Sequence, residues 1–254
     1  MAEGPSSTVT ISRETFRRLV KDVKELTTNP LHSHGIYYNH SEENMLKGKA
    51  LIIGSSETPY ENGYYLFEFE FPANYPHSPP NVRYCTNDGV TRFNPNLYVQ
   101  GKVCLSVLNT WQGDQWTGCQ TIASTLLAIC SIFNNQPLLN EPGLTEKHKD
   151  YENYNTIITY KNFDIAMLQI LTSVTTKEIF SVFNDIIQQH FIENYEKNVK
   201  RLNELLLAHP KREYVQTGMY NMNIRIDYLK LLEKFKTTYN LLEKGWTKTT
   251  TTTF

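Results

Sequence analysis

The sequence predicts an α+β fold, in which an antiparallel four-stranded meander is flanked by helices and followed by a C-terminal helical extension. Apolar residues recur first at helical spacing, then at every second position over residues 35–86, and then again at helical spacing. Connectors rich in Gly, Pro, Asn and Ser separate the alternating segments. Short strands joined by such turns are typical of an antiparallel sheet with at least one buried face.

The first helix is predicted to begin after Ser12, a suitable N-cap, and to end at the "TTNP" of residues 27–30. Its buried face is predicted to consist of Phe16, Leu19, Val23 and Leu26. The opposite face carries Arg17, Arg18, Lys21 and Lys24, a charge run whose ordinary interpretation is a solvated surface. Residues 1–10 are polar, contain no apolar segment of a signal peptide, and are expected to be disordered.

Four short strands are predicted within residues 35–40, 45–55, 63–71 and 81–86. In the third strand, Leu66, Glu68 and Glu70 face one side and three phenylalanines the other. A long irregular segment, residues 87–118, follows the sheet, and a loop of this length in a compact domain is usually functional. Residues 121–135 then predict a buried helix, because they are apolar nearly all round, and residues 147–171 predict further helix.

The C-terminal section, residues 172–246, is predicted to contain two helices. A capping box at Thr175 and Glu178 begins the first, which ends at Pro210. The second covers residues 223–244 and stops at Gly245. Each helix has one apolar stripe, so we expect the extension to dock on the preceding domain, residues 11–171. The Thr-rich tail, residues 247–254, is expected to be disordered.

The composition excludes several classes of function. Lys and Arg total 25 and Asp and Glu total 26, so the net charge of −1 does not favour a nucleic-acid partner. No apolar run is long enough to span a membrane, and we expect a soluble protein of the cytoplasm or the nucleus. The four cysteines are expected to be free thiols, and no metal site is expected because zinc-ligand spacing is missing.

The long loop contains one pair of residues that could take part in catalysis. Asn96 follows Pro95 in a turn, and Cys104 stands eight residues further on in an apolar run. A buried cysteine usually packs as a small hydrophobe, and an asparagine after proline usually serves the turn. The alternative is a thiol nucleophile with an amide accessory.

Four segments make the second interpretation specific. They are "TPYENGYY" at 58–65, "YPHSPP" at 75–80, "NPNLYVQGKVCLSVL" at 94–108 and "DYENYN" at 150–155. In this order they resemble motifs of the ubiquitin-conjugating enzymes, over residues 12–171. The segments "NTWQGDQW" and "NEPG" and the C-terminal extension look most like the enlarged members of that family, the Z type.

The resemblance implies a UBC-like fold and a transferase. It also implies that residues 11–171 are the catalytic domain and that the extension is not needed to form the active site. It implies that Cys104 accepts ubiquitin, or a ubiquitin-like modifier, as a thioester and passes it to a lysine amine or a ligase, with Asn96 stabilising the oxyanion. Arg17, Arg18 and Lys21 are then expected to contact the activating enzyme, and His77, Thr117 and Gly118 to face a ligase. The resemblance also implies that the partners include protein substrates. No cofactor is expected on this chain, since ATP is used by the upstream activating enzyme.

The sequence departs from the family pattern in several places. Asn94 replaces the His of His-Pro-Asn, so an amide must brace the turn, and Asn94→His is expected to be tolerated. Thr117-Gly118-Cys119 replaces Ser-Pro-Ala, His77 replaces an aromatic residue, and Gln136 replaces an acidic one.

The sequence also leaves two other functions possible. A non-catalytic ubiquitin-binding module of the same fold is the first alternative, although such variants lack the cysteine. A thiol hydrolase is the second, although no His/Asp constellation supports it.

Overall fold

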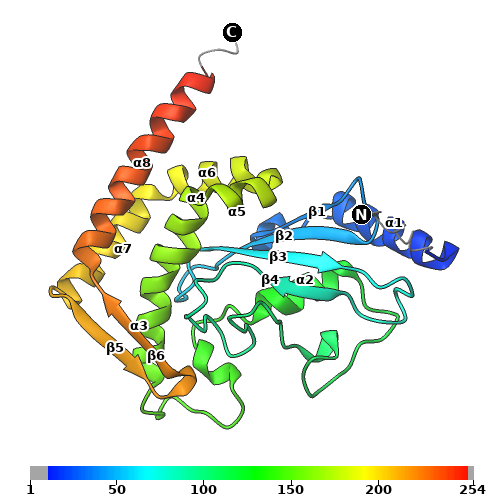
Figure 1. The fold of residues 1–254 in the computed structure, drawn as a ribbon, viewed down its shortest axis with the longest axis horizontal. Helices are drawn as coiled ribbons and strands as arrows, with labels where there is room; N and C mark the ends of the chain where they lie inside the picture. Colours follow the sequence, from blue (N-terminus) through cyan, green and yellow to red (C-terminus); the bar gives the residue numbers. More distant parts are fainter. Residues whose placement is uncertain (1–10, 251–254) are drawn as a thin grey trace, which may run out of the picture.

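The computed structural model describes residues 11–250, with side chains described to residue 244. Its centre is one antiparallel sheet with strand order β1-β2-β3-β4 (Figure 1). The strands are β1 (Ile36–His40), β2 (Lys47–Ile53), β3 (Tyr64–Glu70) and β4 (Asn81–Tyr84). The predicted four-stranded meander is therefore confirmed. Leu51 pairs with Leu66 and Lys49 with Glu68, so the outward face changes from apolar to charged along the strands.

Helix α1 (Arg13–Thr28) lies at one end of the sheet (Figure 1). It begins where predicted, because the Ser12 side chain accepts a 3.0 Å hydrogen bond from the backbone N–H of Thr15. The buried stripe is Thr15, Leu19, Asp22 and Leu26. The prediction that Phe16 belongs to it is wrong, since Phe16 is 49% exposed. The helix is rotated by one position because Asp22 has partners within the fold, including the Tyr75 hydroxyl at 2.5 Å.

Three further α-helices lie in the part of the described chain that precedes the extension. Helix α2 (Ile122–Ser131) buries Ile122, Leu126 and Ile129. Helix α3 (Tyr151–Lys161) continues through the wide turns of η4 (Asn162–Gln169) into α4 (Ile170–Thr172). Short helical turns are η1 (His32–His34), η2 (Ser106–Leu108), η3 (Pro137–Asn140), η5 (Ser181–Phe183) and η6 (Met219–Asn221).

The extension is more broken than predicted. It comprises α5 (Val174–Ile179), α6 (Asn184–Glu193), α7 (Tyr195–Ala208), the hairpin strands β5 (Glu213–Thr217) and β6 (Met222–Ile226), and α8 (Tyr228–Thr250). Ser173, and not Thr175, caps the first helix by accepting from the Thr176 N–H. The hairpin was not predicted, and it delays the last helix to Tyr228. That helix also runs past the predicted end at Gly245 to Thr250.

The extension docks on the first part of the chain, as predicted. Phe183, Ile187 and Phe191 are at most 3% exposed and belong to the same continuous core as the sheet. Tyr64 points its hydroxyl to His190 Nδ1 at 3.2 Å, and the Lys49 ammonium donates to the Ile179 carbonyl at 2.5 Å. The extension therefore covers one end of the outward sheet face, opposite the end where α1 lies (Figure 1).

The two predicted disordered ends lie mostly outside the described residues. Residues 1–10 and 251–254 are not described, and residues 247–250 form the last turn of α8. Within residues 11–250, no helix combines the length and apolar character that a membrane crossing requires.

Candidate active site

The turn at Asn94 is braced by an amide, as the sequence suggested. The Asn94 side chain is fully buried. Its nitrogen donates to the Tyr60 hydroxyl at 2.9 Å and to the Ile132 carbonyl at 2.8 Å. Its oxygen accepts from the Asn96 N–H at 3.0 Å and from the Asn140 amide at 3.2 Å. Four hydrogen bonds thus satisfy one side chain, which fixes the backbone that leads into Asn96.

Asn96 and Cys104 are joined at two points. The Cys104 N–H donates to the Asn96 carbonyl at 2.8 Å, and the Asn96 side-chain nitrogen donates to the Cys104 carbonyl at 2.7 Å. The spacing of eight residues therefore places a neutral amide donor beside the cysteine. Cys104 is only 2% exposed, so the residue is held under cover rather than presented on the surface.

Arg92 also holds this turn, and the sequence analysis missed it. Its Nε donates to the Asn94 carbonyl at 3.2 Å and its Nη2 to the Pro95 carbonyl at 2.7 Å. The guanidinium carbon lies 3.4 Å from the centre of the Tyr98 ring. An arginine two residues before a turn could have been noticed as a candidate, because its fork suits two adjacent carbonyls.

The loop after Cys104 is anchored by polar contacts. The Thr110 hydroxyl donates to the Val103 carbonyl at 2.8 Å and accepts from the Leu105 N–H at 2.9 Å. Trp116 is buried, and its ring N–H donates to the Pro76 carbonyl at 2.7 Å. Trp116 therefore anchors the loop, whereas Trp111 is 38% exposed.

Comparison with known proteins agrees with this arrangement. The family model described as "Ubiquitin-conjugating enzyme" matches residues 18–161, which include Asn96 and Cys104. The chain belongs to the ubiquitin-conjugating enzyme family. Members of this family are transferases, and membership implies interaction with ubiquitin, an activating enzyme and ligases.

The similar proteins include enlarged members, as the resemblance suggested. Ubiquitin-conjugating enzyme E2 Z of Danio rerio is 34% identical over 230 residues, 89% of this chain and 68% of that protein. The Homo sapiens E2 Z is 36% identical over 182 residues, 70% of this chain and 50% of that protein. The human dual E2 ubiquitin-conjugating enzyme/E3 ubiquitin-protein ligase BIRC6 is 35% identical over 192 residues, 69% of this chain but 4% of that protein.

The three predicted ligase-facing residues of this conjugating enzyme lie together on the surface. His77, Thr117 and Gly118 are all exposed. The bond from Trp116 to Pro76 joins their two loops. Arg18 of α1 also holds the second of these loops, because its guanidinium donates to the Gly118 carbonyl at 2.5 Å and to the Gln120 carbonyl. The geometry thus supports one continuous edge, while its role with a ligase stays a prediction.

The predicted contacts for the activating enzyme separate into two kinds. Arg17 and Lys21 are exposed on α1, next to the exposed apolar residues Phe16 and Val20. Arg18 instead turns inward and pairs with Asp22 at 2.8 Å. Its side chain is therefore committed to contacts within the chain.

The other thiols of the conjugating enzyme have different surroundings. Burial, reinforced by the nearby Glu68 carboxylate, raises the pKa of the Cys85 thiol to about 12. Burial also raises the pKa of Cys130. Cys119 is exposed on the loop beside Gly118. The side chain of Gln136 bonds the Glu146 carboxylate, so the amide is held by a neighbouring loop residue.

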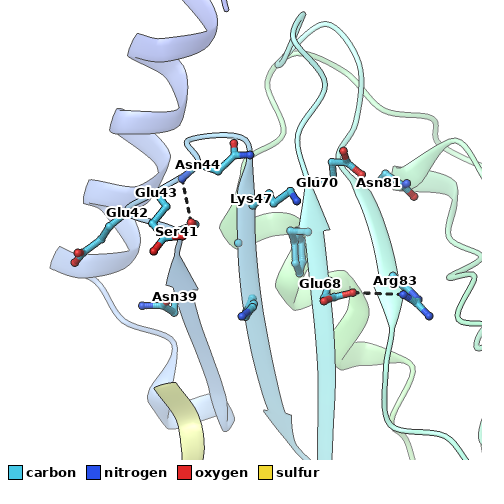
Figure 2. Close-up of a pocket in the computed structure, with 13 residues that line it drawn as sticks. Asn39, Ser41, Glu42, Glu43, Asn44, Lys47, Glu68, Glu70, Asn81 and Arg83 are labelled. Carbon is cyan, nitrogen blue, oxygen red and sulfur yellow. Dashed lines mark hydrogen bonds and ion pairs between the residues drawn. The ribbon is translucent and has the colours of Figure 1, made fainter. Parts of the chain in front are cut away.

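A hollow of about 910 Å³ lies away from the cysteine, on the charged half of the outward sheet face (Figure 2). Glu68 and Arg83 face each other across neighbouring strands there, with a 3.7 Å ion pair. Its lining contains no thiol, and among the described residues no group of three His, Cys, Asp or Glu side chains could hold a metal ion. We therefore place the candidate active site at Asn96 and Cys104, because these residues bring together a thiol that can act as a nucleophile and an amide donor beside it.

Proposed function

We propose that Cys104 accepts ubiquitin, or a ubiquitin-like modifier, as a thioester and releases it to a lysine amine, directly or with the help of a ligase. The observation that carries this proposal is the 2.7 Å hydrogen bond from the Asn96 amide to the Cys104 carbonyl. It supplies a neutral donor next to the only cysteine that stands at the family's spacing. The non-catalytic alternative is disfavoured because such variants lack the cysteine, whereas this chain has both Cys104 and Asn96.

The charging step exchanges one thioester for another. The Cys104 thiolate attacks the carbonyl carbon of the modifier, which arrives as a thioester on the activating enzyme. A carbon–sulfur bond to Cys104 forms, the carbon–sulfur bond to the activating enzyme breaks, and the departing thiolate takes up a proton. ATP is consumed before this step, so the chain itself needs no cofactor.

In the transfer step, a lysine amine attacks the same carbonyl carbon. Negative charge collects on the oxygen, then the bond to Cys104 breaks and the thiolate leaves, while the amine loses a proton to solvent. Asn96 would donate to that oxygen by swinging its amide away from the Cys104 carbonyl. Removing one such donor from an enzyme typically costs about a hundred- to a thousandfold in rate.

The burial of Cys104 restricts what can reach it. A residue that is 2% exposed admits a narrow extended chain more readily than a folded surface. The flexible C-terminal tail of a ubiquitin-like modifier has this form, so the geometry favours it over a bulky acyl donor. We propose that the edge of His77, Thr117 and Gly118 meets a ligase, and that the enzyme acts in the cytoplasm or the nucleus.

One experiment tests the thioester. The protein is incubated with activating enzyme, Mg-ATP and ubiquitin, and in parallel with other modifiers and their own activating enzymes. We expect an adduct that a thiol reductant removes. Cys104→Ser should give an adduct that resists reductant, because an ester replaces the thioester, and Cys104→Ala should give none.

The control is Cys119→Ser, which removes the exposed thiol and should charge normally. Adduct formation by Cys104→Ala would contradict the assignment of the acceptor. If every modifier fails with the native chain, the non-catalytic alternative is favoured.

A further inference from the structure

The hairpin of the extension reaches the active-site turn through Arg92. The backbone N–H of Arg92 donates to the Met222 sulfur at 3.4 Å, on the first residue of β6. The Arg92 guanidinium carbon also lies 5.0 Å from the centre of the Tyr220 ring. Two aromatic rings, those of Tyr98 and Tyr220, therefore contact the group that holds the turn.

Tyr220 is itself held in place on several sides. Its backbone has a φ of 59°, in the left-handed region that a bulky residue rarely adopts, which indicates that the surroundings impose this conformation. Its hydroxyl donates to the Glu141 carboxylate at 2.6 Å. Burial, followed by the bond to Glu141, raises the pKa of the Tyr220 phenol above its ordinary value, so the hydroxyl remains a donor.

A second tyrosine fixes the backbone of Arg92. The Tyr154 hydroxyl donates to the Arg92 carbonyl at 2.7 Å, and the rings of Tyr154 and Tyr220 lie 6.0 Å apart. With the Met222 sulfur on its N–H, Arg92 is thus held at its backbone and at its side chain. Only its fork then faces the turn, where it bonds two consecutive carbonyls.

Those two carbonyls belong to Asn94 and Pro95, the residues directly before Asn96. Because a planar fork bonded at two points resists rotation, it sets the orientation of the peptide that enters Asn96. A small displacement of a transfer group can slow a reaction by a large factor. The path from the extension to the catalytic amide is therefore short: Tyr220, then Arg92, then Asn96.

We infer that Tyr220 is a positioning residue for the transfer step, acting through Arg92 to hold the backbone of Asn96 where its amide can reach the thioester oxygen on Cys104. This inference rests on the proposed role of Asn96. It replaces the expectation that the active site is complete before the extension begins. The extension would then help to form the active site, in addition to covering the sheet.

The first test is single-turnover discharge of the purified ubiquitin thioester at a series of free lysine concentrations. Tyr220→Ala should lower the maximal discharge rate about tenfold and leave the lysine concentration for half-maximal rate unchanged. Charging should be unaffected. Tyr220→Phe keeps the ring over Arg92 and should retain a rate within about twofold of the native one. Tyr214→Ala, on the same hairpin and 66% exposed, is the matched control and should match the native protein.

The second test asks whether Tyr220 acts through Asn96. In an Asn96→Ala background, Tyr220→Ala should slow discharge no further, because the group that it positions is gone. The inference would be overturned if Tyr220→Ala slowed discharge by the same factor in the Asn96→Ala background as in the native protein. It would also be overturned if Tyr220→Ala alone left the discharge rate unchanged. If Asn96→Ala alone discharges at the native rate, the proposed role of Asn96 fails first, and the two failures are thereby distinguished.

Stability must be measured on each variant by thermal melting. If Tyr220→Ala does not fold, Arg92→Lys decides, since it keeps the charge and loses the two-point fork. Arg92→Lys should then show the same slow discharge, with the same absence of further loss in the Asn96→Ala background. A native discharge rate for Arg92→Lys would overturn the inference.

Discussion

Asn62, in the loop before β3, and Asn198, in α7, share a buried hydrogen bond of 2.9 Å although they are 136 positions apart. Asn62 is 8% exposed and Asn198 is 2% exposed, so solvent cannot replace either partner readily. This bond joins the catalytic part of the chain to the extension, and it provides a graded test of how much the docked extension stabilises the fold.

We predict that Asn198→Ala destabilises the protein by about 1–3 kcal/mol, because the Asn62 amide is left buried without its partner. Thermal melting should show a decrease of several degrees in Tm. Asn203→Ala is the matched control, since Asn203 lies on the same helix and is exposed. Equal melting temperatures for the two variants would show that the buried bond contributes nothing.

The elements that follow from the sequence are those with strong local signals. The strands were readable because apolar residues alternate between turn-rich connectors, and the Cys104 site was readable because Asn96 is close to it in sequence. Docking of the extension could also be predicted, because each of the two helices predicted within residues 172–246 has one apolar stripe that must be buried.

The elements that were missed depend on distant partners or on a weak signal. Phe16 was assigned to the core because helical periodicity cannot show that Asp22 has a buried partner in Tyr75. The hairpin does have an alternating pattern, with Val215, Ile224 and Ile226 buried, but the helical pattern after it was extended too far back. Arg92 and Met222 meet across 130 positions, and no local pattern predicts such a contact.

The His190 side chain gives a pH dependence to the docked extension. Burial lowers the pKa of His190, an effect that Glu193 opposes and Lys197 reinforces. The unfolded chain therefore takes up the proton first as the pH falls through the ordinary histidine value, about 6.5. Above that value His190 is neutral in both the folded and the unfolded chain, and the free energy of unfolding does not depend on it. Below that value the folded state loses stability until His190 itself protonates.

We accordingly predict that the free energy of unfolding falls less in His190→Gln than in the native protein when the pH is lowered from 7.5 to 5.5. Urea denaturation at both pH values measures it. Burial also lowers the pKa of His40, which stays in both proteins, so the difference isolates His190. His77→Gln is the control, because that side chain is exposed and lies far along the chain from the extension. A native pH dependence in His190→Gln would contradict the prediction.

Helix α1 should matter for charging and not for transfer. Arg17 and Lys21 are exposed, so reversing their charge should slow the encounter with an activating enzyme without disturbing the core. We predict that Arg17→Glu with Lys21→Glu lowers kcat/KM for charging about tenfold. Discharge of the thioester, once formed with excess activating enzyme, should stay at the native rate.

The control for α1 is Lys230→Glu with Lys236→Glu, which replaces two exposed lysines on α8. It makes the same change of net charge far from α1 and should charge normally. If this control slows charging as much as Arg17→Glu with Lys21→Glu does, the effect comes from net charge rather than from a contact on α1.

The last prediction concerns Asn94, and it reverses the expectation that histidine would be tolerated there. The Asn94 side chain is fully buried, with two donated and two accepted hydrogen bonds. A neutral imidazole is larger and offers one donor and one acceptor, so it must displace a neighbour and leave buried groups unpaired. Asn94→His should therefore destabilise the protein by about 2 kcal/mol or more and slow lysine discharge, because the N–H of Asn96 loses its acceptor.

Melting and single-turnover discharge measure both effects on one preparation. Tyr60→Phe in the Asn94→His protein makes room by removing the hydroxyl that accepts from Asn94, and it should recover part of the stability. That hydroxyl also donates to the Phe93 carbonyl at 2.7 Å, so recovery should be incomplete. If Asn94→His alone melts and discharges like the native protein, the turn is held by Arg92 rather than by the Asn94 network, and the brace is redundant.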